Sequence, residues 1–296
     1  MNLAQTVQYF FSGITVGSIY AIVAIGFNII YNATGIINFA QGEFLILGAM
    51  TAISLSQVLP LPVAIILAVL VTTLAGGLVE IVFIRWIREA SVLRLVVITI
   101  GISIVLREAM LIIWDEKVRS LPYFTGTEVS SIEVLGAHIS PQVLWVLGTC
   151  ALIVASLSLF FKFTLTGQAM RACAANKTAS RLCGINAGRM VTLSFMLSAG
   201  IGALAGCVIS PVTLTQYDRG APLAIKGFTV AILGGLGNST AAVAAGLLLG
   251  VMEAFSISVM PLAYKDAISI VLLLIVLFFK PTGLFASREA SALKEF

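Results

Sequence analysis

The chain has 296 residues, of which 59% are hydrophobic and only 10% are charged. Soluble domains carry about 25% charged residues, so this composition leaves too few polar groups to cover a water-facing surface and excludes an ordinary soluble protein. The net charge of +4 does not indicate a nucleic-acid partner, because the basic residues lie between apolar blocks and form no stripe with interleaved aromatic residues.

The apolar residues occur in blocks long enough to cross a bilayer, which takes about 20 residues per helix. In chain order the candidate helices are residues 9–31, 40–59, 62–84, 92–114, 141–161, 190–210, 239–260 and 266–279, with a shorter apolar segment at 222–236. The sequence therefore predicts an all-α integral membrane protein. We expect a polytopic bundle of about 8–9 transmembrane helices with one short or broken helix, and a single transmembrane domain over residues 1–296.

The charges between these helices predict their orientation. The gap at 85–94 contains three arginines and one glutamate, and the segment 162–189 contains five basic residues and no acid. The loop at 115–140 between them is net acidic. The positive-inside rule places 85–94 and 162–189 in the cytoplasm and 115–140 outside. The side of the C-terminus depends on whether 222–236 crosses the membrane or is re-entrant, and crossing is favoured.

Residues 31–43 interrupt the apolar pattern with amides, glycine and a carboxylate. Irregular backbone at membrane depth needs cover from protein or a water-filled cavity, and an intramembrane acid such as Glu43 is a functional candidate. One interpretation is that Asn38 and Gln41 cap the next helix while Glu43 meets its N-terminal dipole. The other is that the three side chains line a transport pathway. The residues alone leave both open.

A second interruption ends the short apolar segment, in the Gly-Gly-x-Gly turn at 234–237. This turn lacks the Lys-Ser/Thr of a P-loop and follows no strand, so nucleotide binding is not indicated. A half-length helix beside a pathway fits better. The acid Glu253 lies in the middle of the following helix, and either helix–helix hydrogen bonding or pathway lining explains it.

The third irregular segment is the basic stretch at 166–186. Residues 168–183 favour a short amphipathic helix, and Gly184 provides a C-terminal stop. Helical spacing gathers three small or apolar side chains: Met170, Cys173 and Ala174. Such a helix could dock into a groove on a partner, and the alternative is a solvated loop that obeys the positive-inside rule.

The cysteines do not predict a disulfide or a metal site. They form no Cys-x-x-Cys pair and have no histidine at ligand spacing, which leaves small packing residues as the interpretation for Cys150, Cys173, Cys183 and Cys207.

The three irregular segments together resemble one family. The run Gly-Ile-Ile-Asn-Phe-Ala-Gln-Gly-Glu-Phe at 35–44 is similar to the Asn-Phe-Ala-His-Gly-Glu signature of branched-chain amino acid ABC permeases of the LivH type, with Gln41 at the family's usual histidine. The resemblance continues in order through 99–101, 166–186 and 226–237. It covers about residues 10–285.

This resemblance implies the permease subunit of a bacterial inner-membrane importer for leucine, isoleucine and valine. Its partners would be a second, LivM-like permease subunit, two ATP-binding subunits and a periplasmic substrate-binding protein, with membrane lipid around the bundle. The chain has no Walker A pattern, so ATP and Mg would be used by the partner ATPase subunits. The chain itself would be neither an enzyme nor the holder of a cofactor.

The resemblance also assigns candidate residues. The segment 162–189 becomes a cytoplasmic coupling loop, and its candidate coupling residues are Gly167, Arg171, Ala172, Asn176, Ala179 and Gly184. The candidate pathway residues are Asn38, Gln41, Glu43 and Glu253.

Two functional alternatives stay open. Similar permeases carry urea, short amides or aromatic acids, so the substrate is open. An ion-coupled secondary transporter is the alternative from another class, because broken helices also fit that class. A self-sufficient transporter has no need of a docking helix, so the 166–186 segment favours the ABC importer.

Overall fold

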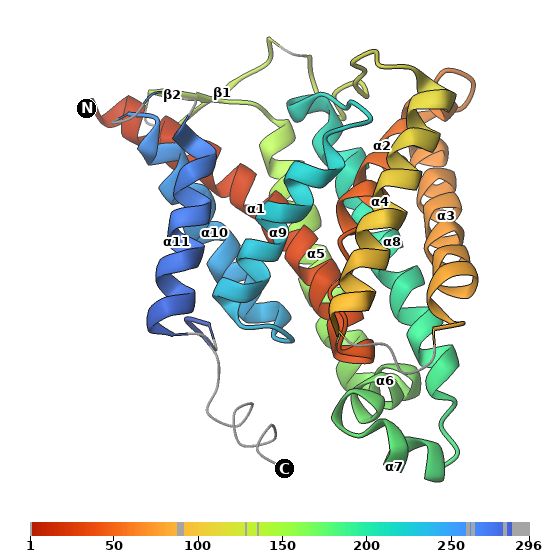
Figure 1. The fold of residues 1–296 in the computed structure, drawn as a ribbon. Coiled ribbons are helices and arrows are strands. Elements are labelled where there is room, and N and C mark those ends of the chain that lie inside the picture. Colours follow the sequence, from red (N-terminus) through yellow and green to blue (C-terminus); the bar gives the residue numbers. More distant parts are fainter. Residues whose placement is uncertain are drawn as a thin grey trace.

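The computed structural model describes residues 2–87, 92–127, 129–134, 136–258, 261, 264–280 and 283–285, so part of the 85–94 gap and the tail beyond 285 lie outside it. The described part is helical apart from one hairpin (Figure 1). The helices are α1 Leu3–Thr34, α2 Gln41–Ser56, α3 Leu61–Val79, α4 Val92–Trp114, α5 Gln142–Phe163, α6 Leu165–Ala175, α7 Lys177–Leu182, α8 Ala187–Thr213, α9 Gly220–Gly234, α10 Ser239–Ser256 and α11 Lys265–Phe279. A π-helical turn, Glu80–Ile84, extends α3, and the antiparallel strands β1 Ile132–Val134 and β2 Ala137–Ile139 form the hairpin.

Helix α1 is longer than its apolar run because both of its ends are capped. The backbone N–H of Asn2 donates to Gln5 Oε1 at 3.3 Å, and the N–H of Gly35 donates to the Tyr31 carbonyl at 2.7 Å. Gly35 adopts the left-handed conformation (φ 71°) that ends many helices. A helix of 32 residues is about 48 Å long, well above the roughly 30 Å of bilayer hydrocarbon. Accordingly, α1 crosses the bundle on a diagonal (Figure 1).

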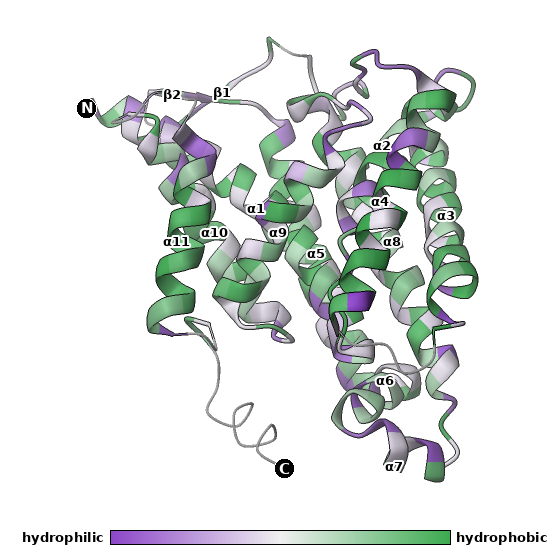
Figure 2. Cartoon of the chain, viewed as in Figure 1, coloured by the Kyte–Doolittle hydropathy of each residue, from purple (hydrophilic) through white to green (hydrophobic). Residues whose placement is uncertain are grey.

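Six of the described helices are long and apolar enough to cross a membrane: α1, α3 with its π-turn, α4, α5, α8 and α10. The helices α2, α9 and α11 have only 16, 15 and 15 residues. The structure therefore shows an all-α protein with six candidate spans among its described residues, as expected for a polytopic protein, and the number of 8–9 transmembrane helices stays a prediction. The outer faces of α3, α4 and α11 are apolar and exposed, as expected for lipid contact (Figure 2).

The most extensive contact between two described helices is that of α1 with α10, which glycines make unusually close. A Cβ atom added to Gly17 would lie 2.6 Å from the carbonyl oxygen of Gly246 and 2.9 Å from the Cα of Leu247. Small residues at such crossings let helix backbones touch, as is typical of helix packing in membranes. The contact explains why α1, although apolar along most of its length, is buried and does not face lipid.

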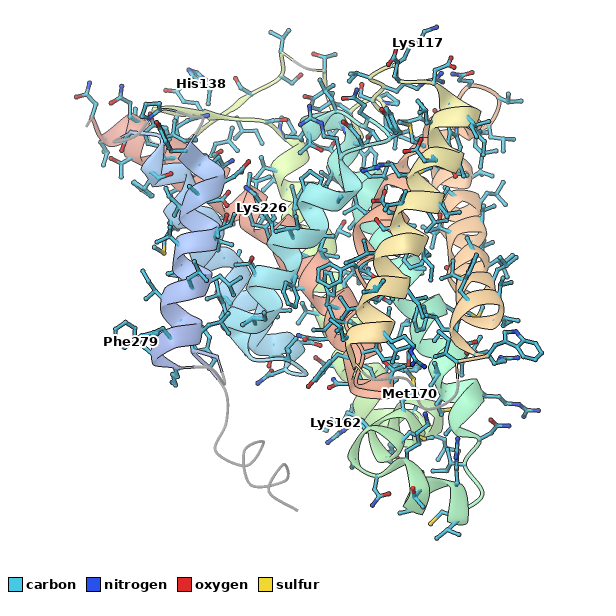
Figure 3. All side chains as sticks on the ribbon, viewed as in Figure 1. Lys117, His138, Lys162, Met170, Lys226 and Phe279 are labelled. Atoms are coloured by element: carbon cyan, nitrogen blue, oxygen red, sulfur yellow. The ribbon has the colours of Figure 1, made fainter. Side chains whose placement is uncertain are left out.

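The two loops with opposite charge lie at opposite ends of the molecule. Figure 3 shows Lys117 and His138 at one end and Lys162 and Met170 at the other. This arrangement confirms the predicted separation of 115–140 from 162–189. In Figure 1, α9 runs from the end with the hairpin toward the end with α6. Helix α10 runs in the opposite direction, and α11 runs in the same direction as α9. A hydrogen bond from the Leu284 N–H to the Leu233 carbonyl at 2.7 Å ties the chain after α11 to the end of α9.

The predicted single helix at 168–183 is wrong, because the structure has two helices, α6 and α7, that meet at Asn176. This residue is extended (φ −153°, ψ 103°), and its side chain accepts from the Ala179 N–H at 2.9 Å. Asparagine competes with the helix for backbone hydrogen bonds and favours caps, so it starts α7 instead of continuing α6.

Candidate functional site

The irregular segment after α1 lies inside the protein and is held by hydrogen bonds. The Ala40 N–H donates to Asn38 Oδ1 at 3.2 Å, so Asn38 stabilises the turn that leads into α2. Gln41 does not cap this helix. Its Nε2 donates to the Ser198 carbonyl at 3.2 Å, and its Oε1 lies 2.6 Å from Ser198 Oγ on α8. The capping interpretation is therefore wrong for Gln41, and Asn38 does not cap the helix either, because the N-cap of α2 is Ala40 and the helix has no side-chain capping bond.

Glu43 is fully buried where two helices begin. It lies in the first turn of α2, as predicted, and also against Gly220, the first residue of α9. A Cβ atom on Gly220 would collide with the Glu43 carboxylate. Ser103 Oγ donates to Oε1 at 2.9 Å, whereas Oε2 has no hydrogen-bond partner among the described residues. The partial positive charge at both helix N-termini stabilises negative charge on this carboxylate.

The two irregular segments predicted from the sequence meet in space. The N–H of Gly237 donates to Asn28 Oδ1 at 3.0 Å, and Asn32 Nδ2 donates to the Gly237 carbonyl at 2.9 Å. Gly237 has φ 94°, which requires glycine here. Nearby, the ring of Phe39 packs against Phe228 with centroids 5.2 Å apart. The break after α1 and the turn after α9 therefore form one junction.

A buried ion-pair network joins α1, α9, α10 and α11 through Glu253. Lys226 Nζ lies 3.0 and 3.1 Å from the two Glu253 carboxylate oxygens and 2.7 Å from Asp266 Oδ1. The Tyr20 hydroxyl donates to Glu253 Oε2 at 2.9 Å and accepts from Lys226 at 2.9 Å. Lys265 lies 3.7 Å from Oε2. Of the two interpretations of Glu253, helix–helix hydrogen bonding is confirmed.

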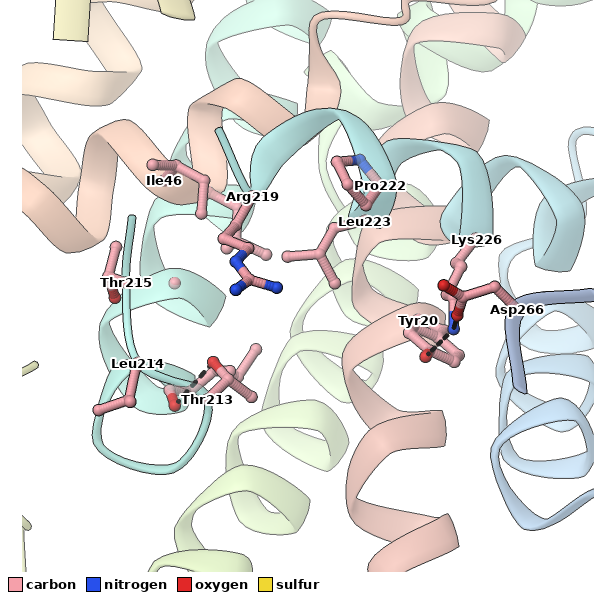
Figure 4. A pocket seen from close by; sticks show the side chains of 13 residues that line it. Tyr20, Ile46, Thr213, Leu214, Thr215, Arg219, Pro222, Leu223, Lys226 and Asp266 are labelled. Carbon is pink, nitrogen blue, oxygen red and sulfur yellow. Dashed lines mark hydrogen bonds and ion pairs between the residues drawn. The ribbon is translucent and has the colours of Figure 1, made fainter. Parts of the chain in front are cut away.

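Beside this network is a cavity of about 220 Å³ (Figure 4). Its lining comes from α1, α2, α8, α9, α11 and the connection 214–219: Tyr20, Leu45, Ile46, Gly206, Ile209, Thr213, Leu214, Thr215, Arg219, Pro222, Leu223, Lys226 and Asp266. The four predicted pathway residues are absent from this lining. Two of them bond to the helices that form it, Gln41 to Ser198 on α8 and Glu253 to Lys226 on α9.

The candidate coupling segment, at the other end, divides into a buried and an exposed side. Gly167 is buried against the backbone of Phe160 and Phe161, and Met170 and Cys173 are buried beside it. The expected docking face through Met170 and Cys173 is therefore wrong, because this face packs against the bundle. The exposed side carries the other candidates, Arg171, Ala172, Asn176, Ala179 and Gly184.

Hydrogen bonds fix the orientation of this segment. Thr164 Oγ1 accepts from the Gly167 N–H at 3.0 Å and starts α6, and Asn186 Oδ1 accepts from the Arg189 N–H at 3.1 Å and starts α8. Gly184, with φ 81°, makes the turn after α7. The segment therefore forms a platform of two capped short helices on a buried anchor.

The described residues contain no group of three or more metal-ligating side chains. The cysteines are free thiols, buried at positions 150, 173 and 207 and exposed at 183.

With this geometry in place, comparisons with known proteins identify the family. The chain belongs to the family described as branched-chain amino acid transport system permease component, which it matches over residues 9–277. It is 33% identical to the high-affinity branched-chain amino acid transport system permease protein BraD of Pseudomonas aeruginosa, over 95% of this chain and 96% of that protein. It is 32% identical to LivH of Salmonella typhimurium, with the same coverage.

A more distant relative is the ribose import permease protein RbsC of Haemophilus influenzae, 25% identical over 80% of this chain and 73% of that protein. Together with the six apolar helices, the family makes this chain a multi-pass membrane protein of the permease class.

Sequence reasoning missed the charged and polar residues around the cavity. Arg219 and Asp266 lie near the ends of apolar runs, where polar residues are common, and Tyr20 lies in the middle of the run at 9–31, so none of the three carries a local signal of a charged network. Lys226 did carry one, because it is the single charged residue within 222–236. An ionisable side chain inside an apolar segment is by default a functional candidate.

Proposed function

We propose that this chain is the permease subunit of an ATP-driven ABC importer for branched-chain amino acids in a bacterial inner membrane. It works with a second permease subunit of LivM type, two ATP-binding subunits and a periplasmic substrate-binding protein. ATP and Mg are used by the ATP-binding subunits. The named functions of BraD and LivH support this proposal, because both are similar to this chain over nearly its whole length.

The observation that carries the coupling part of the proposal is the α6–α7 platform. Its exposed side has basic and small residues together, and its buried side is anchored by Gly167 and Met170. A partner that pushes on α7 therefore moves α5 and α8, which flank the platform in the chain. A link of this kind is required if a conformational change in a soluble ATP-binding subunit is to move the membrane helices.

The proposal extends to the helix count. The short helices α2, α9 and α11 also lie within the bilayer, which together with the six candidate spans gives nine membrane-embedded helices. Two of them, α2 and α9, begin at the contact between Glu43 and Gly220. Asn38, Gln41 and Glu43 hold this contact, and Glu253 holds Lys226 at the cavity. In this proposal the four residues position the pathway walls, and the side chains of the cavity face the solute.

The test is uptake of labelled leucine, urea and benzoate in cells with and without this gene, each with and without ATP depletion at an intact membrane potential. We expect gene-dependent uptake of leucine that is lost on ATP depletion. Gene-dependent uptake of urea or benzoate alone would keep the importer class and refute the amino-acid substrate. Gene-dependent uptake that survives ATP depletion would refute the ABC importer and favour an ion-coupled transporter.

A further inference from the structure

The cavity beside the ion-pair network has the size and polarity of a site for a small solute. Its volume of about 220 Å³ lies below the roughly 300–1,000 Å³ of sites for drug-sized ligands. Its lining contains three charged residues, Arg219, Lys226 and Asp266, together with aliphatic side chains. Figure 4 shows the Arg219 guanidinium pointing into the space between Leu223 and Thr213, with Lys226 and Asp266 on one side.

Arg219 and Lys226 differ in what they can offer a ligand. Lys226 is occupied by Glu253, Asp266 and the Tyr20 hydroxyl. The Arg219 side chain has no hydrogen bond or ion pair within the described part of the chain, although its backbone N–H donates to the Gln216 carbonyl at 3.2 Å. A guanidinium presents a planar fork of donors that matches a carboxylate in bidentate fashion. Arg219 is therefore the cation available to a carboxylate in the cavity.

Asp266 supplies the opposite charge. Its Oδ1 accepts from Lys226 at 2.7 Å, and 77% of its side chain is exposed. A carboxylate accepts several hydrogen bonds, so Asp266 keeps acceptor sites after binding Lys226. Lys226, with its side chain 13% exposed, holds Asp266 at the edge of the cavity. An ammonium group can bind at Asp266 while a carboxylate binds at Arg219.

The wall between these charges is apolar. Leu45, Ile46 and Ile209 are at most 3% exposed and line the cavity with Leu223. The connection that carries Arg219 is tied down, since Thr215 and Arg119 exchange backbone hydrogen bonds of 2.7 and 2.9 Å.

We propose that this cavity binds a zwitterionic aliphatic α-amino acid. The carboxylate binds the Arg219 guanidinium, the α-ammonium binds Asp266, and the side chain packs against Ile46, Ile209 and Leu223. Lys226 and Glu253 are positioning residues. The inference rests on the proposed function and deepens it, because the permease itself recognises both charges of the amino acid during transfer.

The test is equilibrium binding to the purified full-length chain in lipid nanodiscs, without a substrate-binding protein. Three labelled probes differ by one group each: leucine, leucinol (no carboxylate) and 4-methylpentanoate (no ammonium). The variants are Arg219→Gln, Arg219→Lys and Asp266→Asn, and the matched control is Lys117→Gln, an exposed cation at the same end of the molecule. Size-exclusion profiles in the same nanodiscs check that each variant is folded.

We expect wild type and Lys117→Gln to bind leucine alike, and Arg219→Gln to bind it about 10- to 100-fold more weakly, as for loss of a charged hydrogen bond. The leucine affinity of Arg219→Lys is expected between these two, because the ammonium of lysine keeps the positive charge but lacks the planar fork of guanidinium donors. Leucinol binding is unchanged in Arg219→Gln, and 4-methylpentanoate binding is unchanged in Asp266→Asn. This crossed pattern separates recognition from misfolding, since a misfolded variant loses all three probes.

Equal leucine affinity in wild type and Arg219→Gln would overturn the inference, as would wild type binding leucinol as tightly as leucine. If wild type binds no leucine in nanodiscs but cells show ATP-dependent leucine uptake, the proposed function stands and the inference is wrong. If cells show no gene-dependent leucine uptake, the proposed function is refuted, whatever the nanodisc measurements give.

Discussion

Replacing Lys226 with methionine removes the nearest described cation from a carboxylate that is fully buried. Nζ of Lys226 lies 3.0 and 3.1 Å from the Glu253 oxygens, and the Glu253 side chain is 0% exposed. Breaking one side of a buried ion pair costs about 3–5 kcal/mol, because the other charge is left without compensation. In this variant the Glu253 carboxylate keeps two partners, the Tyr20 hydroxyl and Lys265, whose Nζ lies 3.7 Å from Oε2. We therefore expect Lys226→Met to cost about 3 kcal/mol, at the lower end of that range.

The double variant shows whether the cost comes from the pair. Glu253→Gln alone leaves Lys226 paired with Asp266 at 2.7 Å, so we expect a loss of about 1–2 kcal/mol. With both charges removed, no buried carboxylate is left without a partner. The double variant is therefore expected to cost at most about 1 kcal/mol more than Glu253→Gln, which corresponds to a coupling of about 2–3 kcal/mol between the two sites.

The assay is the apparent melting temperature of the purified chain in one detergent, followed as the fraction that elutes as a single species. For a chain of this size 1 kcal/mol corresponds to about 2 °C, so Lys226→Met should melt about 6 °C below wild type. A methionine at Lys117, which is exposed, is the control and should not change the melting temperature. Melting shifts that simply add in the double variant would refute the reasoning, because they would show no interaction between Lys226 and Glu253.

Three further predictions concern packing, a buried hydrogen bond and coupling. Gly17→Ala should lower stability by about 1–3 kcal/mol because its methyl group would strike the backbone of α10, whereas Gly148→Ala, with nothing within 4 Å of its Cβ position, should stay within about 1 kcal/mol of wild type in the same melting assay. Ser198→Ala should cost about 1–3 kcal/mol by leaving the buried Oε1 of Gln41 without its hydroxyl partner; an unchanged melting temperature would contradict the bond. Arg171→Glu should reduce leucine uptake while the melting temperature and membrane yield stay unchanged, and normal uptake would refute the coupling role of α6.

The fold class and most of the helix positions could be predicted from residue order alone. Charge content and run length decide whether lipid or water is the solvent, and neither depends on which helices pack together. The irregular segments at 31–43 and 227–239 were visible because glycine and amides interrupt otherwise continuous apolar runs. The separation of 115–140 from 162–189 followed from charge, and the family followed from motifs in order along the chain.

The site could be predicted only in part, because its contacts join residues far apart in the chain. Tyr20 and Glu253 are 233 positions apart, and Ser198 and Gln41 are 157 apart. The inward face of α6 was missed for a related reason: Met170 and Cys173 look like a docking surface until α1, α5 and α8 are seen to pack against α6. Local sequence therefore determined where helices form, since their hydrogen bonds are local. Helix packing around glycine contacts such as Gly17–Gly246 decided which polar groups meet, because only backbones in close approach bring those side chains within bonding distance.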